Sequence, residues 1–301
     1  MKDLDAIFSP QSIAVVGAST TPGKVGYDIF ANILKGGYRG TLYPVNPTAH
    51  SISSVKAFKT ITEIPDSIDL GIIILPPQLA LSAVEEAIKK NIAGIVIVSA
   101  GFREVGAQGR QIEDKIVAAC REAGVRLIGP NCLGVINPMD SVRMNASFAT
   151  RMPQTGNISF ISQSGALCTS VLDFAADRDF GFSKFISIGN KADVDELDIL
   201  RYLHLDIDTE VIMIYLEELR RGPEFIEEVR NITSGDRPIP ILAIKSGRTS
   251  AGAAAAASHT GSLAGSEAVY AALFKQSGII RCDTIDQLFD YAQAFTYPRV
   301  S

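Results

Sequence analysis

The three histidines differ in the residues around them, and one has neighbours suited to phosphoryl chemistry. His50 lies in a polar stretch and His204 near the end of a helical pattern, so both are expected to be exposed or packed. His259 lies in the segment SHTGSLAG (258–265), which is small, polar and rich in glycine. Such a segment can present an imidazole to a ligand and to a helix N-terminus. A lone histidine is more often structural, but here we expect His259 to carry a phosphoryl group.

A nucleophilic histidine needs neighbours that fix its free nitrogen and neutralise phosphate, and two segments offer them. Ser162, Ser164 and Gly165 end a predicted strand and open a helix, so they supply hydroxyls and backbone N–H groups for an oxyanion. Glu217 ends another predicted strand and could accept a hydrogen bond from the imidazole. Either Glu217 or Glu218 could equally belong to a solvated face, and we favour that interpretation for Glu218.

Other catalytic patterns find little support in the sequence. A nucleophile elbow around Ser164 requires G-x-S-x-G, which fails because Ile161 and Ser162 precede Gln163. The HExxH, GxxxxGK[ST] and EF-hand patterns do not occur, so neither a metal hydrolase nor a P-loop enzyme is indicated, and no metal site is expected.

A glycine-rich turn, GASTTPGKVG (17–26), follows a predicted strand and precedes a helix. Glycines there let the backbone approach a pyrophosphate, and the helix N-terminus provides N–H donors. An NAD site would also need an acidic residue at the end of the second strand, where YPVNP (43–47) has none. The turn therefore predicts a phosphate-bearing ligand other than NAD, or a tight turn without a ligand. Pro76, Pro77 and the segment 99–102 also follow predicted strands, and in open α/β sheets ligands bind at that edge.

Short apolar runs alternate with amphipathic stretches along the whole chain, which predicts parallel sheets covered on both faces. The expected strands are Ile13–Gly17, Leu42–Val45, Leu70–Leu75, Ile95–Ser99, Val125–Ile128, Ile158–Ser162, Phe185–Ile188, Val211–Leu216, Ile239–Ile244 and Ile279–Arg281. The expected helices are Val25–Leu34, Leu79–Lys90, Gln111–Ala123, Leu167–Ala176, Leu197–Leu203, Phe225–Thr233, Ser266–Lys275 and Ile285–Ala294.

The fold class is thus α/β, with an N-terminal Rossmann-like domain and a second, flavodoxin-like domain. After NCLG (131–134) the chain looks irregular through Asn137 and Pro138 to Met152 and Pro153, and we place the domain boundary there. The first domain is expected over residues 1–147 and the second over 148–290. Residues 291–301 read as a linker or as the start of a further domain.

Composition sets the broad class of the protein. Of the 301 residues, 47% are apolar and 20% charged, as in a globular protein, and a net charge of -5 gives no basic field for a nucleic acid. Four cysteines without a CxxC pair suit a reducing compartment. The N-terminus does not read as a secretory signal and no apolar run reaches the length of a membrane span, so we expect a cytoplasmic protein without a membrane partner.

Together these segments resemble the α subunit of succinyl-CoA synthetase and, more closely, the α part of the ADP-forming (nucleoside-diphosphate-forming) acetyl-CoA and acyl-CoA synthetases. The order of the segments carries the resemblance more than any one of them. They are GASTTPGKVG, YPVNP, VKAF, IILPP, VSAGF, IGPNCLGVINP, FISQSGAL, SIGNKADVDELD, IYLEEL and SHTGSLAG, and they span Ile13 to Tyr297.

The resemblance implies a ligase that converts acyl-CoA, phosphate and ADP into a carboxylic acid, CoA and ATP. Phosphate would attack acyl-CoA to give acyl phosphate, His259 would take the phosphoryl group, and ADP would then receive it, all reversibly. The histidine loop would move between the CoA and nucleotide sites, and the small-residue run 252–257 before it suits that movement.

The resemblance also assigns roles to single residues. Ser162, Ser164 and Gly165 would bind phosphate, and Glu217 would hold His259. Coenzyme A would be held by Gly17, Ser19, Gly23 and Val25 at the pyrophosphate, by Val45, Asn46, Pro47 and Lys56 around the adenosine and its phosphate, by Pro76, Pro77, Ser99, Ala100 and Gly101 along the pantetheine, and by Asn131 at the thioester.

The family places ADP or ATP with Mg²⁺ on an ATP-grasp region, a β subunit or a fused C-terminal part, which this sequence does not contain. We therefore expect a hetero-oligomer or a piece of a fused chain, with a small-molecule acyl substrate. The alternative is a non-catalytic CoA or acyl-CoA sensor of the kind fused to protein acetyltransferases. The intact SHTGSLAG, Glu217 and SQSG segments favour the enzyme, because a sensor needs none of them.

Overall fold

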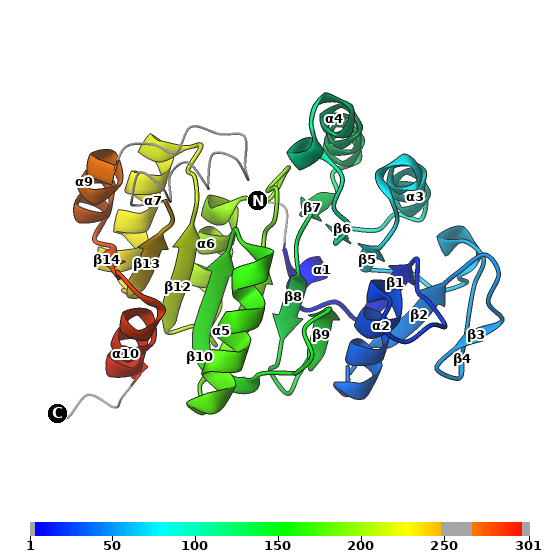
Figure 1. Cartoon of the computed structure of the whole chain (residues 1–301), viewed down its shortest axis with the longest axis horizontal. Coiled ribbons are helices and arrows are strands. Elements are labelled where there is room, and N and C mark those ends of the chain that lie inside the picture. The colour runs from blue at the N-terminus through cyan, green and yellow to red at the C-terminus, as the bar shows by residue number, and fades with distance from the viewer. Residues whose placement is uncertain (1–3, 248–266, 297–301) are drawn as a thin grey trace.

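Two large sheets, the first parallel and the second mostly parallel, organise the computed structural model, which describes residues 4–247 and 267–296, and they lie side by side in two lobes (Figure 1). The first sheet has the order β2-β1-β5-β6-β7, and all of its strands are parallel. The chain adds β2 on one side of β1 and then crosses to β5 on the other, so the switch point lies between β1 and β5. Its strands are β1 (Ser12–Val16), β2 (Thr41–Val45), β5 (Leu70–Ile73), β6 (Gly94–Ile97) and β7 (Arg126–Ile128).

Helices cover both faces of the first sheet. Successive residues of a strand point to opposite faces, and both faces of these strands carry buried apolar side chains that must be covered. Ile13 and Val15 of β1 pack toward α1 (Asp5–Phe8) and α2 (Val25–Lys35). Ala14 and Val16 instead pack toward the helices α3 (Pro77–Lys89) and α4 (Ala107–Ala123).

The second sheet has the order β14-β13-β12-β10-β11-β8-β9. Its members β10 to β14 are parallel, and their switch point lies between β10 and β12. These strands are β10 (Gln154–Ser162), β11 (Gly181–Ser187), β12 (Val211–Leu216), β13 (Ile241–Lys245) and β14 (Ile280–Arg281).

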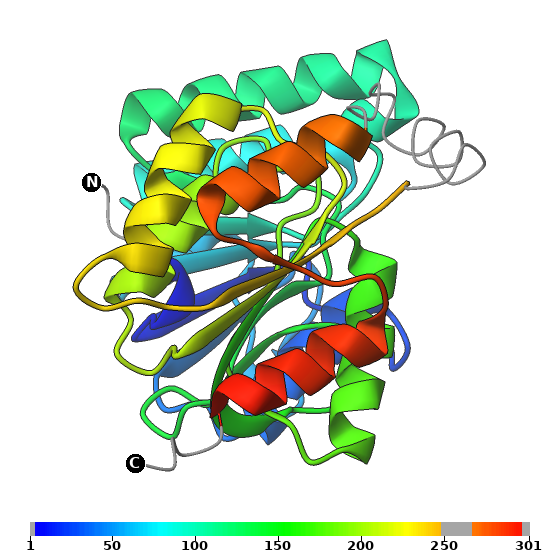
Figure 2. The same ribbon diagram turned by 90° about the vertical axis from the view of Figure 1, so that its left-hand side faces the viewer.

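Among the residues that the structure describes, five helices cover the two faces of the second sheet (Figure 2). One face packs against α5 (Gly165–Asp177) and α10 (Ile285–Thr296), and the other against α6 (Glu196–Leu205), α7 (Gly222–Ser234) and α9 (Glu267–Ser277). The apolar cluster on the α6, α7 and α9 face continues into the core under α1 and α2. The two lobes therefore share part of their hydrophobic core.

The expectation of an irregular stretch after Gly134 is wrong. Strands β8 (Gly134–Asn137) and β9 (Met144–Ser147) form an antiparallel hairpin there, and β8 pairs with β11 (Figure 1). Both strands are fully buried, yet each is four residues long and carries asparagine, so the apolar pattern is too short to predict them. The hairpin lies within residues 1–147, where the first domain was expected, but it is hydrogen-bonded to the second sheet.

The other differences concern element ends and short elements. Helix α4 begins at Ala107 rather than Gln111, and α10 continues through Thr296, so residues 291–296 are helical rather than an extended linker. Short elements without a clear pattern were not expected. They are α1, the strands β3 (Ser51–Ile52) and β4 (Val55–Lys56), and the 3-10 turns η1 (Ile61–Glu63) and η2 (Arg103–Val105).

Among the described residues, none of the helices is both long enough and apolar enough to cross a membrane.

Candidate functional site

The glycine-rich turn lies at the first switch point, wedged between β5 and α2. Its first residue, Gly17, donates its N–H to the carbonyl of Val45 at 3.1 Å and has φ of +91°. A Cβ there would lie 2.4 Å from the carbonyl oxygen of Ile74, and a Cβ on Gly26 would lie 2.1 Å from that of Gly17. Only glycine fits this close approach of backbone to backbone, so the turn has the predicted shape of a ligand-binding βα loop.

The rest of the turn leads into an open helix N-terminus. Ser19 accepts the N–H of Thr21 at 3.1 Å, and Gly23, with φ of +80°, has open space around it. Helix α2 then starts at Val25, which is 39% exposed, without a side-chain cap. The N-terminus of α2 therefore lies next to an exposed loop, where a helix can bind an anion, and Oδ1 of Asp28 in its first turn accepts the N–H of Gly23 at 3.4 Å.

Asn46 joins the end of β2 to this turn. Its Nδ2 donates to the carbonyl of Ala18 at 2.8 Å, while its Oδ1 accepts the N–H of Thr48 at 2.9 Å. Its own N–H bonds the carbonyl of Phe58 at 2.8 Å, and the Nζ of Lys56 lies 5.7 Å from the centre of the Phe58 ring. The predicted adenosine segment is thus adjacent to the predicted pyrophosphate turn. Val45, buried, and Pro47, exposed, flank Asn46.

The next strand ends continue the same edge. Pro77 starts α3, and a Cβ on Gly101 would lie 3.1 Å from its Cγ. Asn131, with φ of +59°, donates its N–H to the carbonyl of Ser99 at 2.9 Å. The segments Pro76–Pro77, Ser99–Gly101 and Asn131 therefore follow one another in space, in the order expected for a pantetheine path.

Glu104 shapes the loop after β6. Its Oε1 accepts the N–H of Gly101 at 2.5 Å and that of Phe102 at 3.1 Å, and its Oε2 accepts from Nδ2 of Asn190 at 2.6 Å. Burial raises the pKa of Glu104, but these hydrogen bonds outweigh burial and hold the pKa below its ordinary value. The carboxylate is therefore the form that the loop stabilises.

Asn190, in the loop between β11 and α6, bridges the two lobes. Besides Glu104 it donates to Oε2 of Glu113 at 3.0 Å, and its Oδ1 accepts from Nδ2 of Asn131 at 3.2 Å. Its N–H also bonds the carbonyl of Pro130 at 2.9 Å. The second lobe thereby fixes the residue expected at the thioester.

The expected phosphate segment lies directly beyond Asn131. Ser164 caps α5 by accepting the N–H of Leu167 at 3.4 Å. Ser162 is fully buried, and its Oγ links back to the Ser164 backbone at 2.9 and 3.0 Å, so it holds the loop. A Cβ on Gly165 would lie 3.6 Å from the backbone nitrogen of Leu133. The N-terminus of α5 therefore meets the chain two residues after Asn131.

Glu217 lies across the second switch point from that segment, held through Gln163. The Oε1 of Gln163 accepts the N–H of Glu217 at 2.7 Å and that of Glu218 at 2.9 Å. The structure thus brings Ser162, Ser164, Gly165 and Glu217 to one edge, as expected. From the sequence we assigned roles to the serines and the glycine of SQSG but none to Gln163. The role of its amide depends on which loop lies opposite, and that is seen only in the structure.

Lys245, which was also given no role from the sequence, ends β13 at the same edge. It is 3% exposed, and its Nζ lies 4.7 Å from the centre of the Tyr270 ring. Burial lowers its pKa, and the charges of Glu217 and Glu267 oppose that effect. A lysine at the end of an apolar strand is a signal that could have identified this cation.

His259 lies outside the described residues, as does the whole of segment 252–265. His50 is exposed, and His204 is half-buried at the end of α6 with its carbonyl accepting from Arg237 at 3.0 Å. Both are thus exposed or packed, as expected. The four cysteines are buried and free, and burial raises the pKa of Cys120, Cys132 and Cys168 to about 12. Within residues 4–247 and 267–296 there is no group of three metal-ligating side chains.

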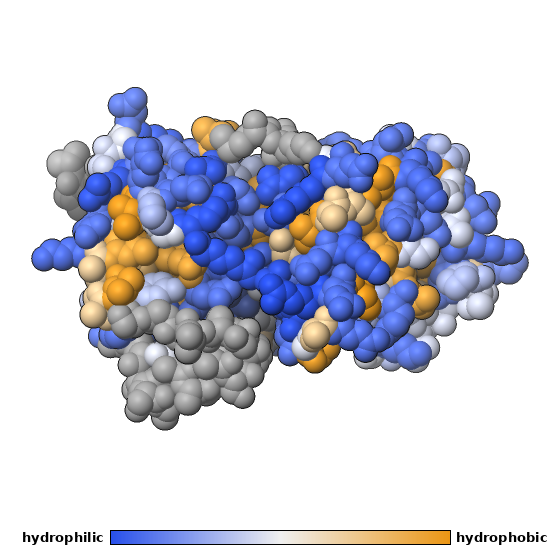
Figure 3. All heavy atoms as spheres, turned by 90° about the horizontal axis from the view of Figure 1, so that it is seen from above, coloured by the Kyte–Doolittle hydropathy of each residue, from blue (hydrophilic) through white to orange (hydrophobic). Residues whose placement is uncertain are grey.

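The surface over the junction of the lobes is mostly hydrophilic when viewed from above (Figure 3). A cavity of about 380 Å³ there is lined chiefly by charged side chains that pair with one another. Arg221, for example, bonds Asp195 at 2.9 Å and Asp198 at 3.1 Å. Lys191 and Arg220 pair with Glu196 and Glu218 outside the lining, so each cation of the cavity has a carboxylate partner, and we assign the cavity to the lobe junction rather than to a ligand site.

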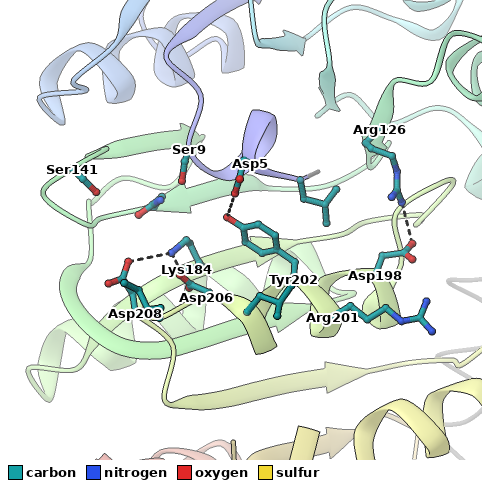
Figure 4. Close-up of a pocket in the computed structure, with 14 residues that line it drawn as sticks. Asp5, Ser9, Arg126, Ser141, Lys184, Asp198, Arg201, Tyr202, Asp206 and Asp208 are labelled. Carbon is teal, nitrogen blue, oxygen red and sulfur yellow. Dashed lines mark hydrogen bonds and ion pairs between the residues drawn. The ribbon is translucent and has the colours of Figure 1, made fainter. Parts of the chain in front are cut away.

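A larger cavity, about 550 Å³, lies beside α1 and α6 (Figure 4). Asp206 and Asp208 on its wall lead into the amino end of β12, whereas ligands of such sheets bind at the carboxyl ends. Its polar side chains pair as Tyr202 with Asp5 at 3.0 Å, Lys184 with Asp206 at 2.9 Å and Arg126 with Asp198 at 3.1 Å. It is therefore separate from the candidate site.

Comparison with known families confirms the two-domain fold. Residues 11–138 match the CoA binding domain, and residues 155–295 match the succinyl-CoA ligase like flavodoxin domain. The chain is thus an α/β protein with a Rossmann-like CoA-binding domain followed by a flavodoxin-like domain.

Individual relatives define the group more closely. The α subunit of acetate–CoA ligase [ADP-forming] II of Pyrococcus furiosus is 43% identical over 295 residues, 98% of this chain and 63% of that one. The 4-hydroxybutyrate–CoA ligase [ADP-forming] of Nitrosopumilus maritimus is 44% identical over 96% of this chain and 41% of its own length. The structure of acetyl-coenzyme A synthetase 1 of Candidatus Korarchaeum cryptofilum, in complex with phosphate and ADP, superposes with a TM-score of 0.93 at 39% identity, covering 99% of this chain and 63% of that one.

Over nearly its whole length, the chain is similar to the α subunit or α region of the ADP-forming acetyl-CoA synthetases. It spans less than two thirds of the length of each of these relatives.

Proposed function

We propose that this chain is the α component of an ADP-forming acyl-CoA synthetase. Phosphate oxygen attacks the acyl carbon of acyl-CoA, the C–S bond breaks, and the thiol of CoA leaves. His259 then takes the phosphoryl group from acyl phosphate and releases the carboxylate. Phosphohistidine finally passes the group to ADP, giving ATP, and each step is reversible.

The observation that carries this proposal is one continuous edge across both lobes. It runs from Gly17 against Ile74 to the contact between Pro77 and Gly101, and then from Ser99 through Asn131 to Leu133 beside the N-terminus of α5. Both switch points of the molecule open on this edge, and a ligand as long as coenzyme A requires such a run. A small ligand would need only one of the two switch points.

In this proposal the glycine-rich turn and the N-terminus of α2 hold the pyrophosphate, and Asn46 and Lys56 lie at the adenosine end. The loops at Pro76–Pro77 and Ser99–Gly101 line the pantetheine, and Asn131 places the thioester. The exposed start of α2 at Val25 and the positive φ of Gly17 fit a pyrophosphate against the backbone, which would take the N–H of Gly23 from its present acceptor, Oδ1 of Asp28.

For the phosphoryl step, the α5 N-terminus beside Ser164 receives phosphate and Glu217 orients His259. Phosphoryl transfer depends chiefly on positioning and on stabilising negative charge, which a helix N-terminus supplies. The buried cation of Lys245 adds positive charge beside Glu217.

The nucleotide step needs further protein. We propose that ADP and Mg²⁺ bind an ATP-grasp partner, either a β subunit or a fused region. Two relatives support this: that of P. furiosus is named a subunit, and the Korarchaeum structure contains ADP.

Release of CoA thiol tests the proposal. Mixing the chain with acetyl-CoA and phosphate should release one thiol per chain in a single turnover, and further turnover should require ADP and the ATP-grasp partner. A thiol reagent can follow release because the protein's own four cysteines are buried. Protection against heat by CoA without thiol release would instead favour a sensor.

A further inference from the structure

The side-chain amide of Gln163 ties together the two loops of the second switch point. It extends from the loop that opens α5, and its Oε1 accepts the N–H groups of Glu217 and Glu218 at 2.7 and 2.9 Å. Its Nε2 donates to the carbonyl of Glu218 at 2.8 Å and to Oε2 of Glu196 at 3.2 Å. The amide thus accepts two hydrogen bonds and donates two, all of them to the loop after β12 or to Glu196 of α6.

A buried ion pair holds the far side of the amide. Lys191 and Glu196 are 3% and 2% exposed, and their Nζ and Oε2 lie 3.1 Å apart. The Nζ of Lys191 also donates to the carbonyl of Glu218 at 2.7 Å, the same oxygen that accepts from Gln163. Gln163 itself is 8% exposed. The amide is therefore buried and held by hydrogen bonds at both its oxygen and its nitrogen.

We propose that Gln163 is a positioning residue for phosphoryl transfer, which sets the place of Glu217 relative to the phosphate loop at the N-terminus of α5. This inference rests on the proposed function, because it concerns the partner of His259. Ser162 and Ser164 flank Gln163 in sequence, so one peptide segment supplies the phosphate site and the clamp on its carboxylate.

No other side chain of similar size performs this task. Two N–H groups need an acceptor, while the Glu218 carbonyl and the Glu196 carboxylate accept from Gln163 as well as from Lys191, and an amide offers acceptor and donor together without a charge. Methionine has similar length but neither function, so Gln163→Met leaves two backbone N–H groups without an acceptor. Glutamate keeps the acceptor, loses the donor, and brings a second negative charge next to Glu196.

The charged and titratable groups around the amide decide how such variants respond to pH. They come from the β11–α6 loop and α6, from the loop after β12, from β13 and from α9, and they are Lys191, Glu196, Glu217, Glu218, Arg220, Lys245 and Tyr270.

The test compares Gln163→Met and Gln163→Glu with the wild type and with Gln111→Met, the same change at an exposed site on α4. Phosphorylation of the chain by acetyl-CoA and phosphate is timed, CoA affinity is taken from thermal protection, and hydrogen exchange is measured at the amides of Glu217 and Glu218. Misplacing a group by about 1 Å costs on the order of 100-fold in rate.

We expect Gln163→Met to slow phosphorylation about 10- to 100-fold, with CoA affinity unchanged and faster exchange at both amides. The phosphorylation rate of Gln163→Glu should rise toward that of the wild type as the pH falls, because its protonated carboxyl can again donate a hydrogen bond. The loss of rate in Gln163→Met should not change with pH. A purely structural role would lower CoA affinity and thermal stability together with the rate, at every pH.

Unchanged exchange at Glu217 and Glu218, or faster exchange with an unchanged rate, would overturn the positioning role. Failure of the proposed function gives a different result. The wild type would then not be phosphorylated at all, while the exchange data would still report whether Gln163 holds the carboxylate loop.

Discussion

Gly17 and Gly23 both have positive φ, but the space around them differs. A Cβ on Gly17 would lie 2.4 Å from a backbone oxygen, whereas one on Gly23 would meet nothing within 4 Å. The first glycine is therefore required by packing and conformation, the second by conformation alone.

Replacing each by alanine should separate these effects. Gly23→Ala adds only left-handed strain, about 1–2 kcal/mol, and should keep CoA binding within about tenfold. Gly17→Ala must also push β5 away from the turn, so it should lose both more stability and most CoA affinity. Chemical unfolding and CoA thermal protection measure the two losses, and equal losses would contradict the assigned geometry.

Glu104 provides a prediction about pH. Its pKa is lowered in the folded chain, so its contribution to stability is complete above the unfolded value, about 4.3, and is lost as the pH falls through the folded value. Glu104→Gln should thus be less stable than the wild type at pH 7, and the difference should shrink as the pH falls to about 4 and below. Urea unfolding at several pH values tests this, and a difference that does not change with pH would refute it.

At the scale of elements, the loop between β11 and α6 makes the main polar bridge between the lobes. Asn190 contacts Asn131, Glu104 and Glu113 from that loop. The Nδ2 of Asn190 donates to both carboxylates, and its Oδ1 accepts from Asn131, the residue that we place at the thioester. The bridge therefore links the CoA path to the second lobe.

Asn190→Ala should weaken acyl-CoA binding more than binding of CoA without its acyl group, because the acyl end is the part near Asn131. Asn190→Asp should be worse, since it adds a third carboxylate to Glu104 and Glu113. Calorimetric titration with both ligands measures this. Equal weakening for CoA and acyl-CoA would place the acyl end elsewhere.

The elements also show what sequence patterns can predict. Runs such as Val211–Leu216 are apolar and β-branched, so the parallel strands and their helices were predicted, with ends displaced by a few residues. The β8–β9 hairpin was missed because its strands are short and because β8 pairs with β11, which lies beyond the domain boundary expected from the sequence. Pairing between distant segments leaves no periodic signal in either one.

For the molecule as a whole, the sheet topology explains which candidate site residues could be predicted from the sequence. Gly17, Ser164 and Glu217 follow predicted strands, and the carboxyl edge of a parallel sheet gathers them whatever the details. Gln163, Asn190 and Lys191 act through loops whose neighbours depend on strand order and on how the two lobes pack. Strand order cannot be read from one sequence, so these roles required the structure.

Locating the phosphoryl group tests the central claim most directly. The chain is incubated with acetyl-CoA and phosphate, and phosphopeptides are mapped under conditions that preserve phosphohistidine, with His204→Asn as the matched control for His259→Asn. We predict acid-labile phosphate on His259 in the wild type and in His204→Asn, and none in His259→Asn. Phosphate on another residue, or equal labelling of His259→Asn, would contradict the account.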